Sequence, residues 1–223
     1  MFYDTAEYRT LIIELDKRGY QIVTHAIGAG AVHMVLDSYQ ELEKVNGPRD
    51  RRLRMEHLFN IETEDMPRFA KLSTIVGMQP AFCCGGFSGN TSNQFGSVES
   101  SRAMLSFSSD WPCSFPPDPF AGIQQAAMRE VRRPVTMHGP SPEPPQFSGP
   151  EQRISVEQAL AAYTKTGAYA RFAENQTGTL EVGKDADLAE LSQDIFSVPH
   201  EKIGQTHVLM TMVGGKIVFA ENP

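Results

Sequence analysis

The chain has 223 residues, of which 40% are hydrophobic and 21% charged, as in ordinary globular proteins. Its net charge of −7 and its lack of a lysine and arginine cluster argue against nucleic-acid binding, because phosphate neutralisation requires a basic surface. No apolar run approaches the about 20 residues of a membrane span, and the amino-terminal segment lacks the features of a signal peptide. The three cysteines, Cys83 and Cys84 among them, form neither a disulfide framework nor a CxxC zinc pattern. We therefore expect a cytoplasmic protein without a membrane or nucleic-acid partner.

The first part of the chain predicts an alternation of helices and strands. Residues 5–18 place apolar side chains on one helical face, and Gly19 is a stop signal. The run 21–28 is short, β-branched and bounded by glycine, which is typical of a buried strand. Residues 31–44 again have helical spacing, and the NGP of 46–48 ends that helix.

The alternation continues through the middle of the chain. Residues 51–58, 73–80 and 103–110 are predicted strands, and a helix is expected to begin at Thr63. Asp118 and the proline after it predict the start of another helix, with a capping side chain and proline in the first turn. This order of elements predicts a parallel sheet with right-handed crossovers.

Two connections are less regular. Residues 81–102 are rich in glycine, serine and asparagine, so that either their crossover helix is vestigial or the loop is irregular. Residues 134–153 contain six prolines and are expected to form a long surface loop. Ser155 and Gln158 then predict a capping box that opens a helix.

The end of the chain changes character. We predict a partial α/β barrel over 1–177 and a small β portion over 178–223, with strands in the runs GTLEVGKDADLAEL and VLMTMVGGKIVFAE. The Gly214-Gly215 pair is typical of a two-residue hairpin turn. Lys184 and Asp187 are expected to fix a turn and a strand entry in this portion rather than to act in catalysis.

Three side chains stand at the ends of predicted strands, namely His25, His57 and Asp110. Because parallel strands of an α/β barrel gather their functional groups at the carboxyl ends, these side chains are expected to converge. Two imidazoles and a carboxylate suit a hydrolytic divalent metal, most commonly Zn²⁺. With such a metal bound, Asp110 would serve as ligand and as general base for the attacking water.

Each of these residues also has a structural interpretation. Either histidine could be a satisfied core residue, and Asp110 could cap a turn in SSDWP. Glu56 precedes His57 on a strand and should point to the opposite face, which favours a structural contact. Trp111 could line a substrate pocket or simply pack.

Several runs together give the chain a specific resemblance. HAIG, RMEHL, SDWP with the DPF after it, SVEQALAAYT, GTLEVGKDADLAEL and MVGGKIVF resemble, in this order, the carboxyl-terminal half of a metal-dependent amidohydrolase. The matching branch is that of the N-substituted formamide deformylases. This resemblance implies a (β/α)8 barrel with a β-sandwich assembled from both chain ends, in which His25, His57 and Asp110 end strands five, six and eight. It also implies zinc-dependent hydrolysis of carbon–nitrogen bonds, other than peptide bonds, in small-molecule amides.

Two departures from the family pattern lead to an alternative. The His-x-His of strand one and the ligand of strand four would precede Met1, and Ala29 stands where an aspartate is usual. The alternative is therefore a catalytically inactive fragment, or a subunit that pairs with a missing amino-terminal half. In either case we expect the chain alone to hold metal poorly. We also expect it to self-associate through its open sheet edges, for example as a homo-oligomer.

Overall fold

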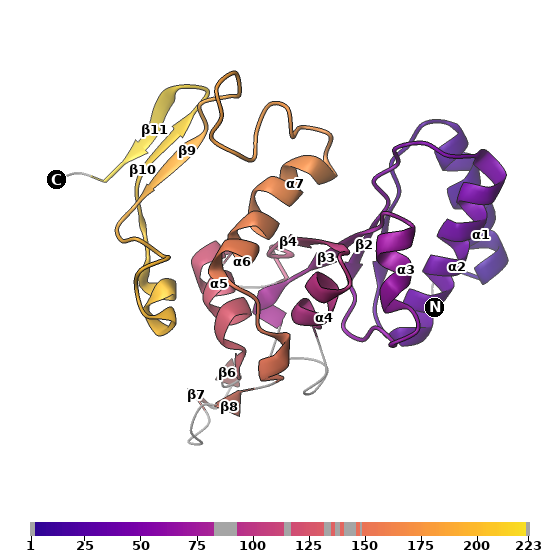
Figure 1. Cartoon of the computed structure of the whole chain (residues 1–223), viewed down its shortest axis with the longest axis horizontal. Coiled ribbons are helices and arrows are strands. Elements are labelled where there is room, and N and C mark those ends of the chain that lie inside the picture. Colours follow the sequence, from indigo (N-terminus) through magenta and orange to yellow (C-terminus); the bar gives the residue numbers. More distant parts are fainter. Residues whose placement is uncertain are drawn as a thin grey trace.

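The computed structural model has a four-stranded parallel sheet at its centre (Figure 1). It describes residues 3–82, 93–113, 117–131, 135–136, 139–140, 146–147 and 149–221. The strands are β1 (Val23–Ala26), β2 (Arg54–His57), β3 (Ile75–Met78) and β4 (Met104–Phe107), and they lie in the order β1-β2-β3-β4. Each neighbouring pair is parallel, which confirms the predicted α/β class and parallel sheet.

The helices that connect the strands follow the predicted order. They are α1 (Thr5–Lys17), α2 (Ala29–Asn46), α3 (Met66–Lys71), α4 (Phe95–Ser100), α5 (Pro119–Met128), α6 (Val156–Tyr163) and α7 (Lys165–Ala170). In Figure 1, α1 and α2 pack side by side on the β1 side, whereas α5 to α7 lie between the parallel sheet and the last strands. None of the helices in the described residues is long and apolar enough to cross a membrane.

One helix begins later than predicted, and a short helix in the irregular connection matches one of the two alternatives given for it. α3 begins at Met66 rather than Thr63, because residues 63–65 form a turn and the buried Asp65 carboxylate accepts from Arg68 instead of capping the helix. The irregular connection 81–102 contains the 3₁₀ turn η1 (Pro80–Phe82) and the six-residue α4. A short crossover helix is thus present, and residues 83–92 lie outside the described residues.

The proline-rich segment contains short strand pairs where it is described. β5 (Glu130–Val131) pairs with β8 (Gln146–Phe147), and β6 (Val135–Thr136) pairs with β7 (Gly139–Pro140), both antiparallel. The 3₁₀ turn η3 (Pro150–Gln152) follows. The capping box of α6 is confirmed, since Gln158 N donates to Ser155 Oγ at 3.2 Å and Ser155 N donates to Gln158 Oε1 at 2.8 Å.

A separate antiparallel sheet ends the chain. Its strands β9 (Leu188–Leu191), β10 (Val208–Val213) and β11 (Lys216–Ala220) lie in the order β11-β10-β9, and the 3₁₀ segment η4 (His200–Gln205) packs on α5. Gly214 and Gly215 both have positive φ, as the predicted hairpin turn requires. The predicted strand over 178–191 is wrong in its first ten residues, which form turns and irregular backbone. Asp187 fixes this region, because its Oδ1 accepts from Gly214 N at 2.7 Å.

Candidate active site

The two predicted histidines meet at the carboxyl end of the parallel sheet. His25 lies in β1 and His57 ends β2, and the register pairs His25 with Glu56. The imidazole centroids are 4.3 Å apart, with an interplanar angle of 63°. The two imidazole rings, which helix α2 separates in the sequence, are therefore in edge-to-face contact.

The backbone at both strand ends explains this approach. Gly28 has φ +86°, a conformation that side chains disfavour, and its carbonyl accepts the first amide hydrogens of α2, from Ala31 and Val32. His57 itself has φ +78°, which is uncommon for a residue other than glycine. Burial along β2 alternates up to His57, but the Gln79 side chain contacts both His57 and Glu56, so alternation alone does not separate the two.

Gln79, directly after β3, joins these two side chains. The His57 ring is buried at 7% exposure, and its Nδ1 lies 2.9 Å from Gln79 Oε1. Gln79 Nε2 donates to Glu56 Oε2 at 3.0 Å and to Ser108 Oγ at 2.9 Å. Sequence reasoning missed Gln79 and Ser108, although both lie near the carboxyl ends of predicted strands, the end of the sheet where His57 lies. Glu56 was expected to make a structural contact, and its hydrogen bond with Gln79 is such a contact, but it lies within the site.

The surroundings of His25 favour a neutral ring. Partial desolvation lowers the pKa of His25 and the adjacent His57 lowers it further, whereas the carboxylates of Asp110 and Glu56 act in the opposite direction. The net pKa lies below the ordinary value. A neutral imidazole is the form that binds a metal ion.

Asp110 follows β4 in a left-handed conformation with φ +54°. Its carbonyl oxygen accepts from Cys113 N at 2.7 Å, so the backbone rather than the carboxylate closes this turn. Because Asp110 comes after the last residue of β4, it lies at the carboxyl end of the sheet, as His25 does. Trp111 is 63% exposed, which leaves little of its side chain to packing.

The structure brings the histidines together more closely than it brings Asp110 to them. Within the described ranges, no three His, Cys, Asp or Glu side chains are grouped so that they could hold a metal ion. The imidazole pair is thus an observed feature, and the three-residue ligand set stays a prediction.

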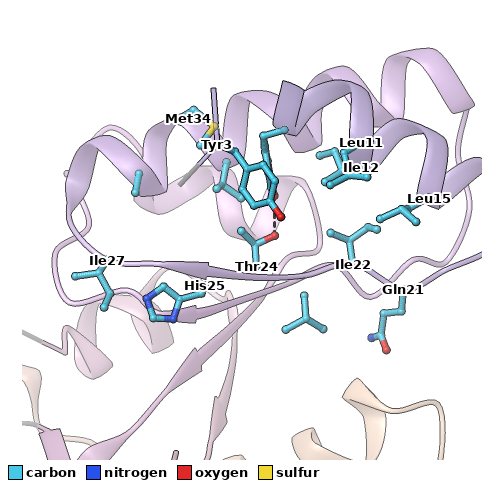
Figure 2. A pocket seen from close by; sticks show the side chains of 14 residues that line it. Tyr3, Leu11, Ile12, Leu15, Gln21, Ile22, Thr24, His25, Ile27 and Met34 are labelled. Carbon is cyan, nitrogen blue, oxygen red and sulfur yellow. Dashed lines mark hydrogen bonds between the residues drawn. The ribbon is translucent and has the colours of Figure 1, made fainter. Parts of the chain in front are cut away.

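An apolar groove runs beside β1, the edge strand of the sheet (Figure 2). The groove has a volume of about 800 Å³, and its side chains come from α1, β1 and the start of α2. Figure 2 shows His25 and Ile27 near one end of the groove and Leu15 and Gln21 near the other. The imidazole of His25 therefore borders an open and largely apolar surface.

The family model described as "Amidohydrolase family" matches residues 1–219. Together with the parallel sheet and the histidines at its carboxyl end, this match shows that the chain belongs to the amidohydrolase family.

Individual proteins are similar over nearly the whole chain. Protein LONG AFTER FAR-RED 3 of Arabidopsis thaliana is 30% identical over 97% of this chain and 37% of its own length. The N-substituted formamide deformylase of Arthrobacter pascens is 28% identical over 98% of this chain and 40% of its own length. An uncharacterized metal-dependent hydrolase from Pyrococcus furiosus has a similar structure, with a TM-score of 0.63 and 26% identity over 83% of this chain and 36% of that protein. The chain spans about two fifths of the length of the curated relatives it matches.

Proposed function

We propose that this chain forms strands five to eight of an amidohydrolase barrel that hydrolyses carbon–nitrogen bonds, other than peptide bonds, in small-molecule amides. The single observation that carries the proposal is the contact between His25 and His57 at the carboxyl ends of neighbouring parallel strands. This is the end at which barrel enzymes place their catalytic groups. The printed name of the Arthrobacter relative, a formamide deformylase, supports an amide as the substrate class.

The side chains present fit a divalent metal of the zinc type. His25 and His57 would hold the ion, since imidazole nitrogen is a preferred zinc ligand and the two ring centroids lie 4.3 Å apart at the sheet end. His57 also has the hydrogen-bonded outer partner that ligating histidines commonly have. When bound, such an ion acidifies a water molecule and polarises the amide carbonyl.

Asp110 would supply proton transfer. Its carboxylate takes the proton of the attacking water and returns it to the nitrogen of the departing amine. Its position after β4, on the same side as His25, suits this role and that of an additional ligand. Two imidazoles and one carboxylate leave room for ligands from the part of the relatives that this chain does not span.

Complementation tests this proposal. The chain is coexpressed with the amino-terminal three fifths of the Arthrobacter relative, and hydrolysis of simple N-substituted formamides is measured with added zinc. We expect hydrolysis that requires both polypeptides and that falls about 100-fold or more in Asp110→Asn, because the base is removed. Ser109→Ala is the matched control, since it changes a neighbouring side chain that has no assigned part in proton transfer.

The alternative is an inactive fragment or a partner subunit. It predicts a soluble, zinc-loaded complex without hydrolysis. An Asp110→Asn complex with unchanged activity would contradict the role given to Asp110, whichever polypeptide supplies the other ligands.

A further inference from the structure

We propose that Gln79 is a positioning residue that holds His57 as its Nδ1-protonated tautomer and thereby directs the unprotonated Nε2 to the metal. The inference rests on the proposed function, because it assigns the nitrogen through which His57 acts. It goes further in giving a role to Gln79, Glu56 and Gly77.

The orientation of the Gln79 amide follows from its neighbours. Glu56 is a carboxylate and can only accept, so the Gln79 atom 3.0 Å from Glu56 Oε2 must be the NH₂ group. The second hydrogen of that group is directed to Ser108 Oγ at 2.9 Å. Both amide hydrogens are then used, and Oε1 faces His57 Nδ1 at 2.9 Å.

An amide oxygen can only accept a hydrogen bond. Because Oε1 faces Nδ1, the neutral His57 ring must carry its hydrogen on Nδ1 and a lone pair on Nε2. Gln79 is 1% exposed, so water does not compete at this contact. The tautomer is thus set by a chain of contacts that starts at the Glu56 carboxylate.

The position of that carboxylate is itself fixed. Arg54 Nε lies 2.6 Å from Glu56 Oε1. Across the sheet, Glu56 pairs with Gly77, and a Cβ atom at Gly77 would lie 2.5 Å from both carboxylate oxygens. Gly77 has no positive φ, so the requirement at this position is for space. Gly77 therefore leaves space for Glu56, Glu56 orients Gln79, and Gln79 faces His57.

Nitrogen-15 NMR of the imidazole in the metal-free full chain tests the inference. At a pH where the ring is neutral, long-range proton–nitrogen correlations distinguish a protonated Nδ1 from a protonated Nε2. We expect Nδ1 protonation of His57 in the wild type and a shift toward the Nε2-protonated form in Gln79→Leu. We also expect zinc affinity to fall 10–100-fold in that variant, as for other lost partners of ligating histidines.

The second arm keeps the test decisive if Gln79→Leu folds poorly. The exchange variant Glu56→Gln with Gln79→Glu reverses the hydrogen bond between 56 and 79, with the donor now at 56. It keeps an acceptor at 79 for His57 Nδ1, so it should keep both the tautomer and the zinc affinity. Gly77→Ala should displace Glu56 and give an intermediate population. His25 is the internal reference, since its tautomer should change little in each variant.

A wild-type His57 that is protonated on Nε2, or a Gln79→Leu variant with an unchanged tautomer, would overturn the inference. If instead the tautomers behave as expected but neither the wild type nor the exchange variant binds zinc, the proposed metal site fails while the contact between Gln79 and His57 stands. The two failures are therefore distinguishable.

Discussion

The two ends of the parallel sheet use charged and polar residues in different ways. At the amino end, Arg52 stands before β2 with 8% of its side chain exposed. It donates to both carboxylate oxygens of Glu174, at 2.7 and 2.6 Å, and lies 3.9 and 4.0 Å from the ring centroids of Tyr169 and Phe172. Its guanidinium ties the start of β2 to the end of α7, distant in sequence.

A second cluster at the amino end is also satisfied within itself. The buried Asp16 carboxylate, at the end of α1, accepts from Arg49, from Arg51 at 2.9 Å and from Asn46 at 2.8 Å. These contacts fasten α1 to the segment between α2 and β2. By contrast, the carboxyl end has two imidazoles in contact and an exposed His25 ring. The comparison indicates that the amino end serves stability, whereas the carboxyl end leaves the His25 imidazole accessible.

The largest expected loss of stability is at Asp16. Asp16→Asn removes the charge that compensates Arg51, whose side chain is 3% exposed. We expect the free energy of unfolding to fall by about 3 kcal/mol, as for other broken buried ion pairs. Urea denaturation of both proteins at neutral pH measures this difference, and an unchanged midpoint would contradict the stabilising role of the cluster.

The same cluster predicts a dependence on pH. Burial by itself would raise the pKa of Asp16, but hydrogen bonds from Arg51, Asn46 and Arg49 outweigh it, so the pKa is lowered in the folded state. The stabilisation is therefore complete above the unfolded-state pKa of about 3.9 and is lost as pH falls through the folded-state value. The wild type should lose stability below about pH 4 more steeply than Asp16→Asn. Parallel pH profiles would refute this.

Arg52 should contribute somewhat less. Arg52→Ala removes the ion pair with Glu174 and the two ring contacts, and we expect a loss of about 2 kcal/mol. Arg52→Lys keeps the charge but not the planar fork, and should recover only part of the loss. Thermal denaturation of the three proteins checks the order. A lysine variant as stable as the wild type would show that charge alone matters.

The open edge of β1 predicts self-association more than a change in stability. Val23 and Ile27 are 46% and 49% exposed beside the groove, and the open edge of a strand with apolar neighbours tends to pair with another chain. Light scattering of the isolated chain should detect dimers or larger species. Val23→Lys should reduce them while changing the unfolding free energy by about 0.5 kcal/mol or less. A monodisperse wild-type monomer would contradict the expectation.

The smallest effect on stability is expected at His25. His25→Asn alters an exposed ring, so the unfolding free energy should change by about 0.5 kcal/mol or less. Denaturation under the conditions used for Asp16→Asn gives a direct comparison of the two sheet ends. A loss as large as that of Asp16→Asn would show that His25 is a structural residue.

The predictable features were those with a local signal. Short strand-like runs between predicted helices indicated the four parallel strands, and His25 and His57 lie near the ends of two of them, as expected. Gln79 had no such signal, because a single polar residue after a strand is common. Its role becomes evident only from its contacts with His57 and Glu56 in the folded chain. Alternation alone also did not separate Glu56 from His57, since the Gln79 side chain contacts both. The segment before β9 was overpredicted because its alternating residues form turns held by side chains such as Asp187.

Zinc binding by the isolated chain tests the central contrast between the two ends most directly. Equilibrium dialysis compares the wild type with His25→Asn, His57→Asn and the control His207→Asn. His207 directly precedes β10 and has an exposed ion-pair partner, Glu221. We expect weak binding in the wild type, with less than one equivalent kept after dialysis against metal-free buffer. Affinity should fall at least about tenfold in each of the two site variants and remain unchanged in His207→Asn. Zinc binding that is equal in all four proteins would contradict the assignment of the carboxyl end as a metal site.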